Sequence, residues 1–165
     1  MTQSHVSPRI IWNDFDRMAP AVIRALRDLS RAVEASGLDK ALIELIKVRA
    51  SQINGCAYCI QYHLNLARGL PVLPAKLDLL AAWREAGIYS ARERMALAWT
   101  EALTLMAGHP VPDTLYTELQ TQFSAPEIAF LTAAIGLINA WNRISGALQF
   151  VPPIPSEPLA AGGSR

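Results

Sequence analysis

Residues 44–63 read Glu44-Leu-Ile-Lys-Val-Arg-Ala-Ser-Gln-Ile-Asn-Gly-Cys56-Ala-Tyr-Cys59-Ile-Gln-Tyr-His63, and both cysteines of the chain lie in this segment. The stretch around Glu44 is rich in apolar residues: Leu42, Ile43, Leu45, Ile46 and Val48. The residues after Gly55 contain no Pro or Gly until Gly69. The sequence therefore predicts one helix from about Asp39, a turn at Asn54-Gly55, and a second helix that opens at Cys56 and runs to about Arg68.

Helix geometry brings the polar residues of this segment together. At 3.6 residues per turn, Cys56, Cys59 and His63 fall within an arc of about 60°. If the chain reverses at the turn, Glu44 lies about 16 Å back along the first helix and His63 about 13 Å along the second. Glu44 is then placed against His63, and His63 reaches back to Cys59. A carboxylate that orients an imidazole, which in turn activates a thiol, is the arrangement of an assisted nucleophile.

The spacing Glu, eleven residues, Cys-x-x-Cys, three residues, His resembles the core of the alkylhydroperoxidase D-like proteins of the carboxymuconolactone decarboxylase superfamily. Arg49-Ala-Ser-Gln-Ile-Asn-Gly before the cysteines is also typical of that group. A second match is Asn139-Ala-Trp-Asn-Arg143, and the resemblance covers roughly residues 8–150. One position departs from it: the prototype peroxidase has His beside the second cysteine, where this chain has Tyr58.

The resemblance implies a thiol peroxidase that reduces hydrogen peroxide or a small organic hydroperoxide. Cys59 would attack the peroxide and become a sulfenic acid, and Cys56 would resolve it to a disulfide. An external dithiol or redox protein would then reduce the pair through Cys56, expected to be the more exposed sulfur. His63, oriented by Glu44, would shuttle protons. This mechanism needs no metal, haem or flavin cofactor.

Other interpretations of the same residues stay open. The cysteines could be buried core thiols, or they could bind zinc together with His63 and Glu44, although the usual second Cys/His pair is missing. Glu44 could instead pair with Lys40 or Lys47 on its own helix. The alternative functions are an enzyme of the decarboxylase type, whose members do not depend on a Cys-x-x-Cys pair, and a non-catalytic redox-responsive oligomer.

Five further positions have weaker signals. Tyr58 and Tyr62 lie four residues apart on a neighbouring helix face, where they are expected to pack or to line a substrate pocket. Asn139, Asn142 and Arg143 match the family signature, but a buried polar network between helices is the favoured interpretation.

The rest of the chain predicts an all-α, single-domain helical bundle of about seven helices. Apolar residues recur at three- and four-residue steps from Asp14 to Ala35, which indicates one amphipathic helix. Ser90-Ala-Arg-Glu93 and Ser124-Ala-Pro-Glu127 match the capping box and open two more helices. The predicted organisation is an N-terminal arm at 1–12, an alkylhydroperoxidase D-like helical domain at 13–150, and a Pro/Gly-rich flexible tail at 151–165.

Composition restricts the partners. The chain has 165 residues, and its 15 Lys and Arg nearly balance 14 Asp and Glu, so neither a nucleic acid nor an anionic membrane is an expected partner. Charged residues make up only 18%, against 52% hydrophobic ones, which favours a homo-oligomer, a trimer or a hexamer, in which subunits cover apolar surface. Two cysteines and no apolar signal core at the N-terminus predict a cytoplasmic location.

Overall fold

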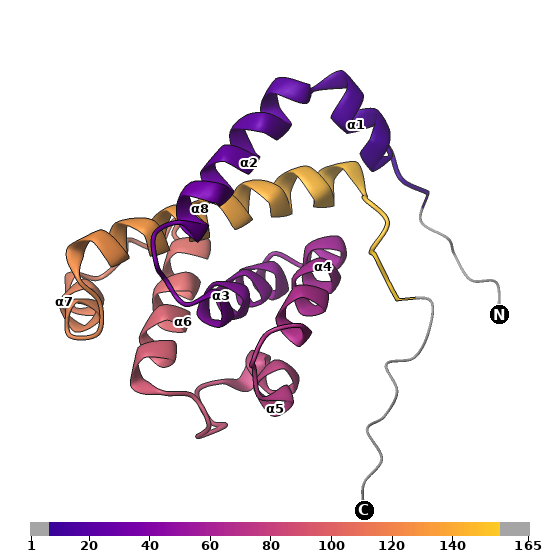
Figure 1. The fold of residues 1–165 in the computed structure, drawn as a ribbon. Coiled ribbons are helices and arrows are strands. Elements are labelled where there is room, and N and C mark those ends of the chain that lie inside the picture. The colour runs from indigo at the N-terminus through magenta and orange to yellow at the C-terminus, as the bar shows by residue number, and fades with distance from the viewer. Residues whose placement is uncertain (1–6, 156–165) are drawn as a thin grey trace, which may run out of the picture.

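The computed structural model describes residues 7–155, and within that range the chain forms α-helices, one short 3-10 helix (η1) and no strand (Figure 1). The elements are α1 (Trp12–Met18), α2 (Pro20–Glu34), α3 (Lys40–Ile53), α4 (Ala57–Arg68), α5 (Pro74–Asp78), η1 (Leu80–Ala82), α6 (Ala91–Thr104), α7 (Asp113–Gln120) and α8 (Ala125–Leu148). The prediction of an all-α fold is confirmed. The described range holds eight α-helices, one more than the rough number predicted.

The single helix predicted for residues 14–35 is wrong, because the chain breaks at Ala19. Pro20 has no backbone N–H and disfavours the helical conformation of the residue before it, and Ala19 has φ −129° and ψ 51°. Two helices result, and α1 already begins at Trp12. α1 and α2 form an arch on one side of α8 (Figure 1).

Parts of the predicted arm and tail lie outside the described residues, namely 1–6 and 156–165. The described part of the arm is attached to the end of α8. There the backbone N–H and the guanidinium of Arg9 donate to the carbonyls of Leu148 and Ala147, each at 3.0 Å. Residues 151–155 form no helix, and the Asn65 side-chain amide donates to the carbonyl of Pro153 at 2.9 Å. The proposed domain limits stay a prediction.

The core is built around α3 and α8. α8 packs against α2, α3, α4 and α6, and α3 packs against α4 and α6 (Figure 1). Both capping boxes form as predicted, at the starts of α6 and α8. Within residues 7–155, none of the helices combines the length and apolarity that crossing a membrane requires.

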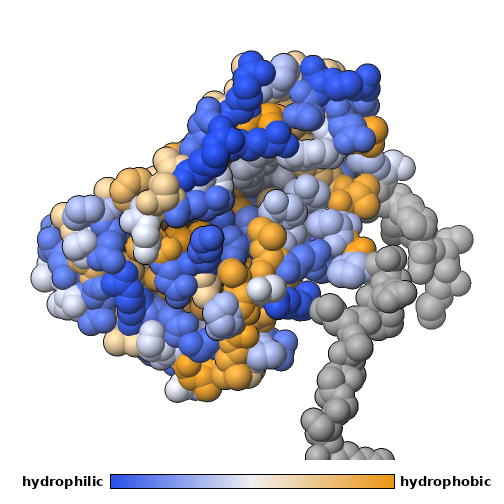
Figure 2. All heavy atoms as spheres, in the orientation of Figure 1, coloured by the Kyte–Doolittle hydropathy of each residue, from blue (hydrophilic) through white to orange (hydrophobic). Residues whose placement is uncertain are grey.

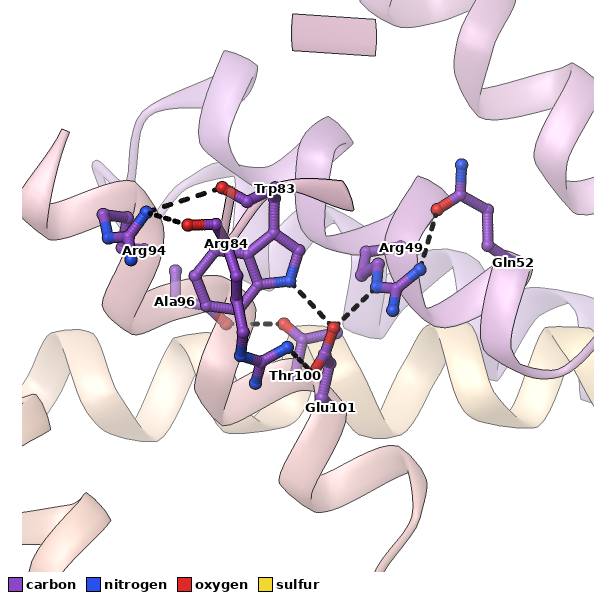
Figure 3. Close-up of polar contacts among 8 residues, drawn as sticks. All are labelled: Arg49, Gln52, Trp83, Arg84, Arg94, Ala96, Thr100 and Glu101. Atoms are coloured by element: carbon purple, nitrogen blue, oxygen red, sulfur yellow. Dashed lines mark hydrogen bonds and ion pairs between the residues drawn. The ribbon is translucent and has the colours of Figure 1, made fainter. Parts of the chain in front are cut away.

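A half-buried carboxylate fixes α3 against α6. Glu101 of α6 accepts hydrogen bonds from Arg49 Nε of α3 at 2.8 Å and from the Trp83 indole at 2.8 Å, and Arg84 pairs with its second oxygen (Figure 3). Burial would raise the pKa of Glu101, but the hydrogen bonds from Trp83, Arg84 and Arg49 outweigh it and lower the pKa. Because Arg49 follows Glu44 on α3, this cluster also helps to hold the helix that carries Glu44.

Candidate active site

The turn between α3 and α4 places the two cysteines. Gly55 has φ +65°, a left-handed conformation that glycine adopts without the strain of a side chain. The preceding Asn54 amide donates to the side-chain oxygens of Asn139 and Asn142 on α8, both at 2.9 Å. Asn142 in turn donates to Ser51 at 2.9 Å. The polar network favoured for Asn139 and Asn142 is therefore present, and it ties the turn to α8.

Cys56 is the N-cap of α4, as the sequence predicts. Its sulfur accepts the backbone N–H of Cys59 at 3.4 Å. Both cysteines are reduced and each is only 3% exposed. They pack against Tyr58, Ile138 and Trp141. The expectation that Cys56 is the more exposed sulfur is wrong, because side chains of α8 cover it as well as Cys59.

The two thiols have opposite acidities. A hydrogen bond from the Cys59 side chain, together with the Cys59 backbone N–H, lowers the pKa of Cys56 to about 7 against the effect of burial. Hydrogen bonding to Cys56 and then burial raise the pKa of Cys59, while the nearby polar groups of Asn142 and Ser145 act in the opposite direction. Cys56 is thus the readily ionised thiol, and Cys59 needs a base.

Glu44 and His63 meet across the helix pair, where the sequence places them. His63 Nδ1 lies 2.7 Å from Glu44 Oε2, and Lys47 Nζ donates to Glu44 Oε1 at 2.9 Å. The carboxylate therefore contacts both His63 and Lys47, the partners that the two interpretations of Glu44 expected, and its role in proton transfer stays a prediction. All three side chains are buried.

The protonation states follow from this contact. Burial would raise the pKa of Glu44, but the hydrogen bond and charge of His63, and then Lys47, lower it. Burial lowers the pKa of His63, and the Glu44 carboxylate only partly opposes this. A neutral imidazole that donates from Nδ1 to a carboxylate leaves Nε2 free to accept a proton.

A cavity of about 350 Å³ opens beside this group, under the arch of α1 and α2, where Figure 2 shows the surface hollowed. Its wall includes Cys59, His63, Glu44 and Lys47, but not Cys56. Tyr58 and Tyr62 line it too, with their rings stacked at 6.1 Å, and so take the place expected of them. The remaining lining residues are Trp12, Leu26, Arg27, Ser30, Glu34, Leu66, Leu137, Ile138, Trp141 and Ser145.

The sequence did not single out Trp12 or Ser145 as part of the site. Trp12 reaches the cavity because α1 folds back over α4, and it stacks on Tyr58 at 6.3 Å. Ser145 had a usable signal, because Asn139, Asn142 and Ser145 recur every three residues on an otherwise apolar helix. Residues 7–155 contain no group of three or more His, Cys, Asp and Glu side chains arranged to hold a metal ion, so the zinc interpretation lacks its ligands.

Comparisons with known proteins agree with this geometry. The protein YdfG of Bacillus subtilis, itself uncharacterized, is 36% identical over 131 residues, which are 79% of this chain and 89% of the relative. A solved structure from Agrobacterium tumefaciens has a TM-score of 0.84 at 36% identity and covers 90% of this chain and 100% of its own. That protein is of unknown function and is provisionally assigned to antioxidant defence as AhpD.

A peroxidase-related protein of Ralstonia eutropha with an alkylhydroperoxidase AhpD core has a TM-score of 0.74 at 22% identity. The match covers 84% of this chain and 74% of that one, and at this identity it shows the fold alone. The Carboxymuconolactone decarboxylase family matches residues 20–102, half of the chain. The chain therefore belongs to the carboxymuconolactone decarboxylase family and has the alkylhydroperoxidase D-like fold.

Proposed function

We propose that the protein is a thiol peroxidase that reduces hydroperoxides with its Cys56/Cys59 pair. The observation that carries the proposal is the Glu44–His63 hydrogen bond on the wall of a cavity that Cys59 also lines. The cavity, at about 350 Å³, has room for an organic hydroperoxide as well as for hydrogen peroxide. The provisional antioxidant assignment of the Agrobacterium tumefaciens protein points the same way.

In the first step, His63 Nε2 takes the proton of Cys59, whose raised pKa calls for a base. The Cys59 sulfur bonds to the terminal oxygen of ROOH, and the O–O bond breaks with its electron pair on the RO oxygen. The proton held by His63 passes to that oxygen and gives ROH. Cys59 is oxidised to a sulfenic acid.

In the second step, Cys56 resolves the sulfenic acid. In the reduced pair, the Cys59 thiol helps to lower the pKa of Cys56 to about 7, and the Cys59 backbone N–H still favours the Cys56 thiolate once Cys59 is oxidised. Its sulfur bonds to the Cys59 sulfur, and the hydroxyl leaves with a proton as water. An external dithiol then returns the disulfide to two thiols by exchange and is itself oxidised. A cytoplasmic location would supply such dithiols and stays part of the proposal.

The test is peroxide consumption with an added dithiol, for wild type beside Cys59→Ser and Cys56→Ser. Wild type should consume many equivalents, and Cys59→Ser none. Cys56→Ser should consume about one equivalent and stop, because its sulfenic acid has no resolving partner. Wild type that stops after one equivalent would support the redox-responsive oligomer instead. Wild type that consumes no peroxide would reject the peroxidase and favour the decarboxylase-type alternative.

A further inference from the structure

Ser145 lies in the wall of the cavity, and its hydroxyl has no hydrogen-bond partner in the protein. The residue is only 1% exposed. Among the side chains of residues 7–155, its Oγ is the one buried nitrogen or oxygen without a hydrogen-bond partner. Buried polar groups in native proteins are nearly always paired, so an exception at a cavity surface indicates a group kept free for a ligand.

Other helical hydroxyls of the same chain show what Ser145 could have done. Ser51 donates to the carbonyl of Lys47, Thr100 to that of Ala96 and Thr117 to that of Asp113, each four residues earlier in its helix. A serine inside a helix can form this bond when its side chain does not point to solvent. Ser145 sits inside α8 and forms no such bond to the carbonyl of Trp141.

The residues around Ser145 indicate what kind of group its hydroxyl could bind. Cys59 and His63 line the same cavity, where Glu44 is engaged with His63 and Lys47; Asn142, behind Cys59, is engaged with Ser51 and Asn54. The Ser145 hydroxyl lies close enough to Cys59 to lower the pKa of that thiol. It has no hydrogen-bond partner in the protein, so its proton is available to a ligand bound at the sulfur.

We propose that Ser145 is a catalytic residue that donates a hydrogen bond to the departing RO oxygen of the hydroperoxide bound at Cys59. The proposal rests on the peroxidase function given above. When the Cys59 sulfur bonds to the terminal oxygen, the O–O bond breaks and negative charge collects on the RO oxygen. Ser145 stabilises this charge and keeps its own proton, while His63 supplies the proton that completes ROH. A fixed donor aimed at developing charge in a site shielded from water lowers the barrier of such a step.

The experiment compares wild type with Ser145→Ala on three substrates: tert-butyl hydroperoxide, hydrogen peroxide and peracetic acid. The leaving oxygen is strongly basic in the first two and weakly basic in the third, so help from a donor matters least for peracetic acid. We expect kcat/KM of Ser145→Ala to fall at least about tenfold with tert-butyl hydroperoxide, and several times less with peracetic acid. An equal loss for all three substrates, or no loss, overturns the proposal.

Two controls separate chemistry from structure. Ser145→Ala removes an unpaired buried hydroxyl, so its unfolding temperature should stay the same or rise. Thr100→Val removes a paired buried hydroxyl outside the cavity, and it should lower the unfolding temperature while leaving kcat/KM unchanged. Ser145 also lowers the pKa of the Cys59 thiol, and a change in thiolate fraction would alter kcat/KM by the same factor with all three substrates. Only a loss that depends on the leaving oxygen therefore supports the proposal.

The peroxidase function and the role of Ser145 would be rejected by different results. Wild type inactive on every peroxide rejects the peroxidase function, and the role of Ser145 falls with it. Active wild type with an equally active Ser145→Ala rejects the role of Ser145 alone.

Discussion

Glu44 uses each oxygen of one carboxylate for a different neighbour, His63 and Lys47. These contacts act on different properties of the protein. The His63 contact fixes the ring orientation that proton transfer needs, whereas the Lys47 contact neutralises a buried ammonium group. A substitution at Glu44 should therefore change both turnover and stability, and a second substitution should separate them.

Glu44→Gln should lower peroxide turnover about 10- to 1,000-fold, because His63 loses the charged acceptor that orients it and supports its basicity. It should also destabilise the fold, since Lys47 is left buried without its counter-charge. The double variant Glu44→Gln/Lys47→Met should recover stability and remain slow. Turnover per folded molecule and denaturation midpoints measure the two effects. A double variant that also regains full turnover would remove Glu44 from the mechanism.

The stability of the protein should fall as the solution is made acidic. The pKa of His63 is lowered from its ordinary value of 6.5, so below pH 6.5 the unfolded chain binds a proton that the folded one does not. The pKa of Glu44 is lowered from 4.5, which adds a second loss below pH 4.5. Urea denaturation at a series of pH values should show both. His63→Gln should lose the decline that begins near pH 6.5, and an unchanged decline would contradict the assignment.

At the scale of the elements, α3 carries Glu44, and Glu101 of α6 fixes it through Arg49. Glu101→Ala should destabilise the protein by about 2–4 kcal/mol, because it leaves two arginines and a buried indole N–H without their acceptor. Asp28→Ala is a suitable control: Asp28 pairs with Arg31 on the exposed face of α2, where an ion pair contributes below about 1 kcal/mol. Equal losses in urea denaturation would show that the Glu101 cluster does not hold α3.

The sequence predicts the ends of helices correctly where a single local residue determines the backbone conformation. The turn at Gly55 and the capping boxes of Ser90 and Ser124 are cases of this kind. The prediction of one helix over residues 14–35 missed the break at Pro20, because the three- and four-residue apolar spacing continues unchanged from α1 into α2.

The candidate site was predictable to the extent that helix geometry alone fixes it. Glu44 and His63 lie on adjacent helices joined by a tight turn, so residue counting was enough to pair them. The cover over Cys56 and the unpartnered hydroxyl of Ser145 both depend on how α8 packs onto α4. No local pattern encodes that packing.

The whole molecule leaves large apolar side chains on its surface. Met18, Val22 and Leu29 of α1 and α2, with Tyr62 and Leu66 of α4, are all exposed in a single chain. We propose that they are covered in a homo-oligomer, since a soluble chain rarely leaves so many apolar groups in water. Light scattering at micromolar concentration should return three or six times the 18.0 kDa of one chain. A mass of one chain at every concentration would reject the oligomer.

Because both sulfurs are buried, the two steps of the proposed cycle, peroxide reduction and disulfide reduction, differ in how easily the reactant reaches the site. A hydroperoxide is small enough to pass under the arch of α1 and α2 and reach Cys59. A reducing protein must bring its own thiolate to the Cys56 sulfur, which lies outside the cavity under side chains of α8. Regeneration then waits for a transient opening of the helices around Cys56, and its rate levels off as reductant is added. The rate of helix opening, and not the concentration of reductant, would then limit the proposed peroxidase cycle.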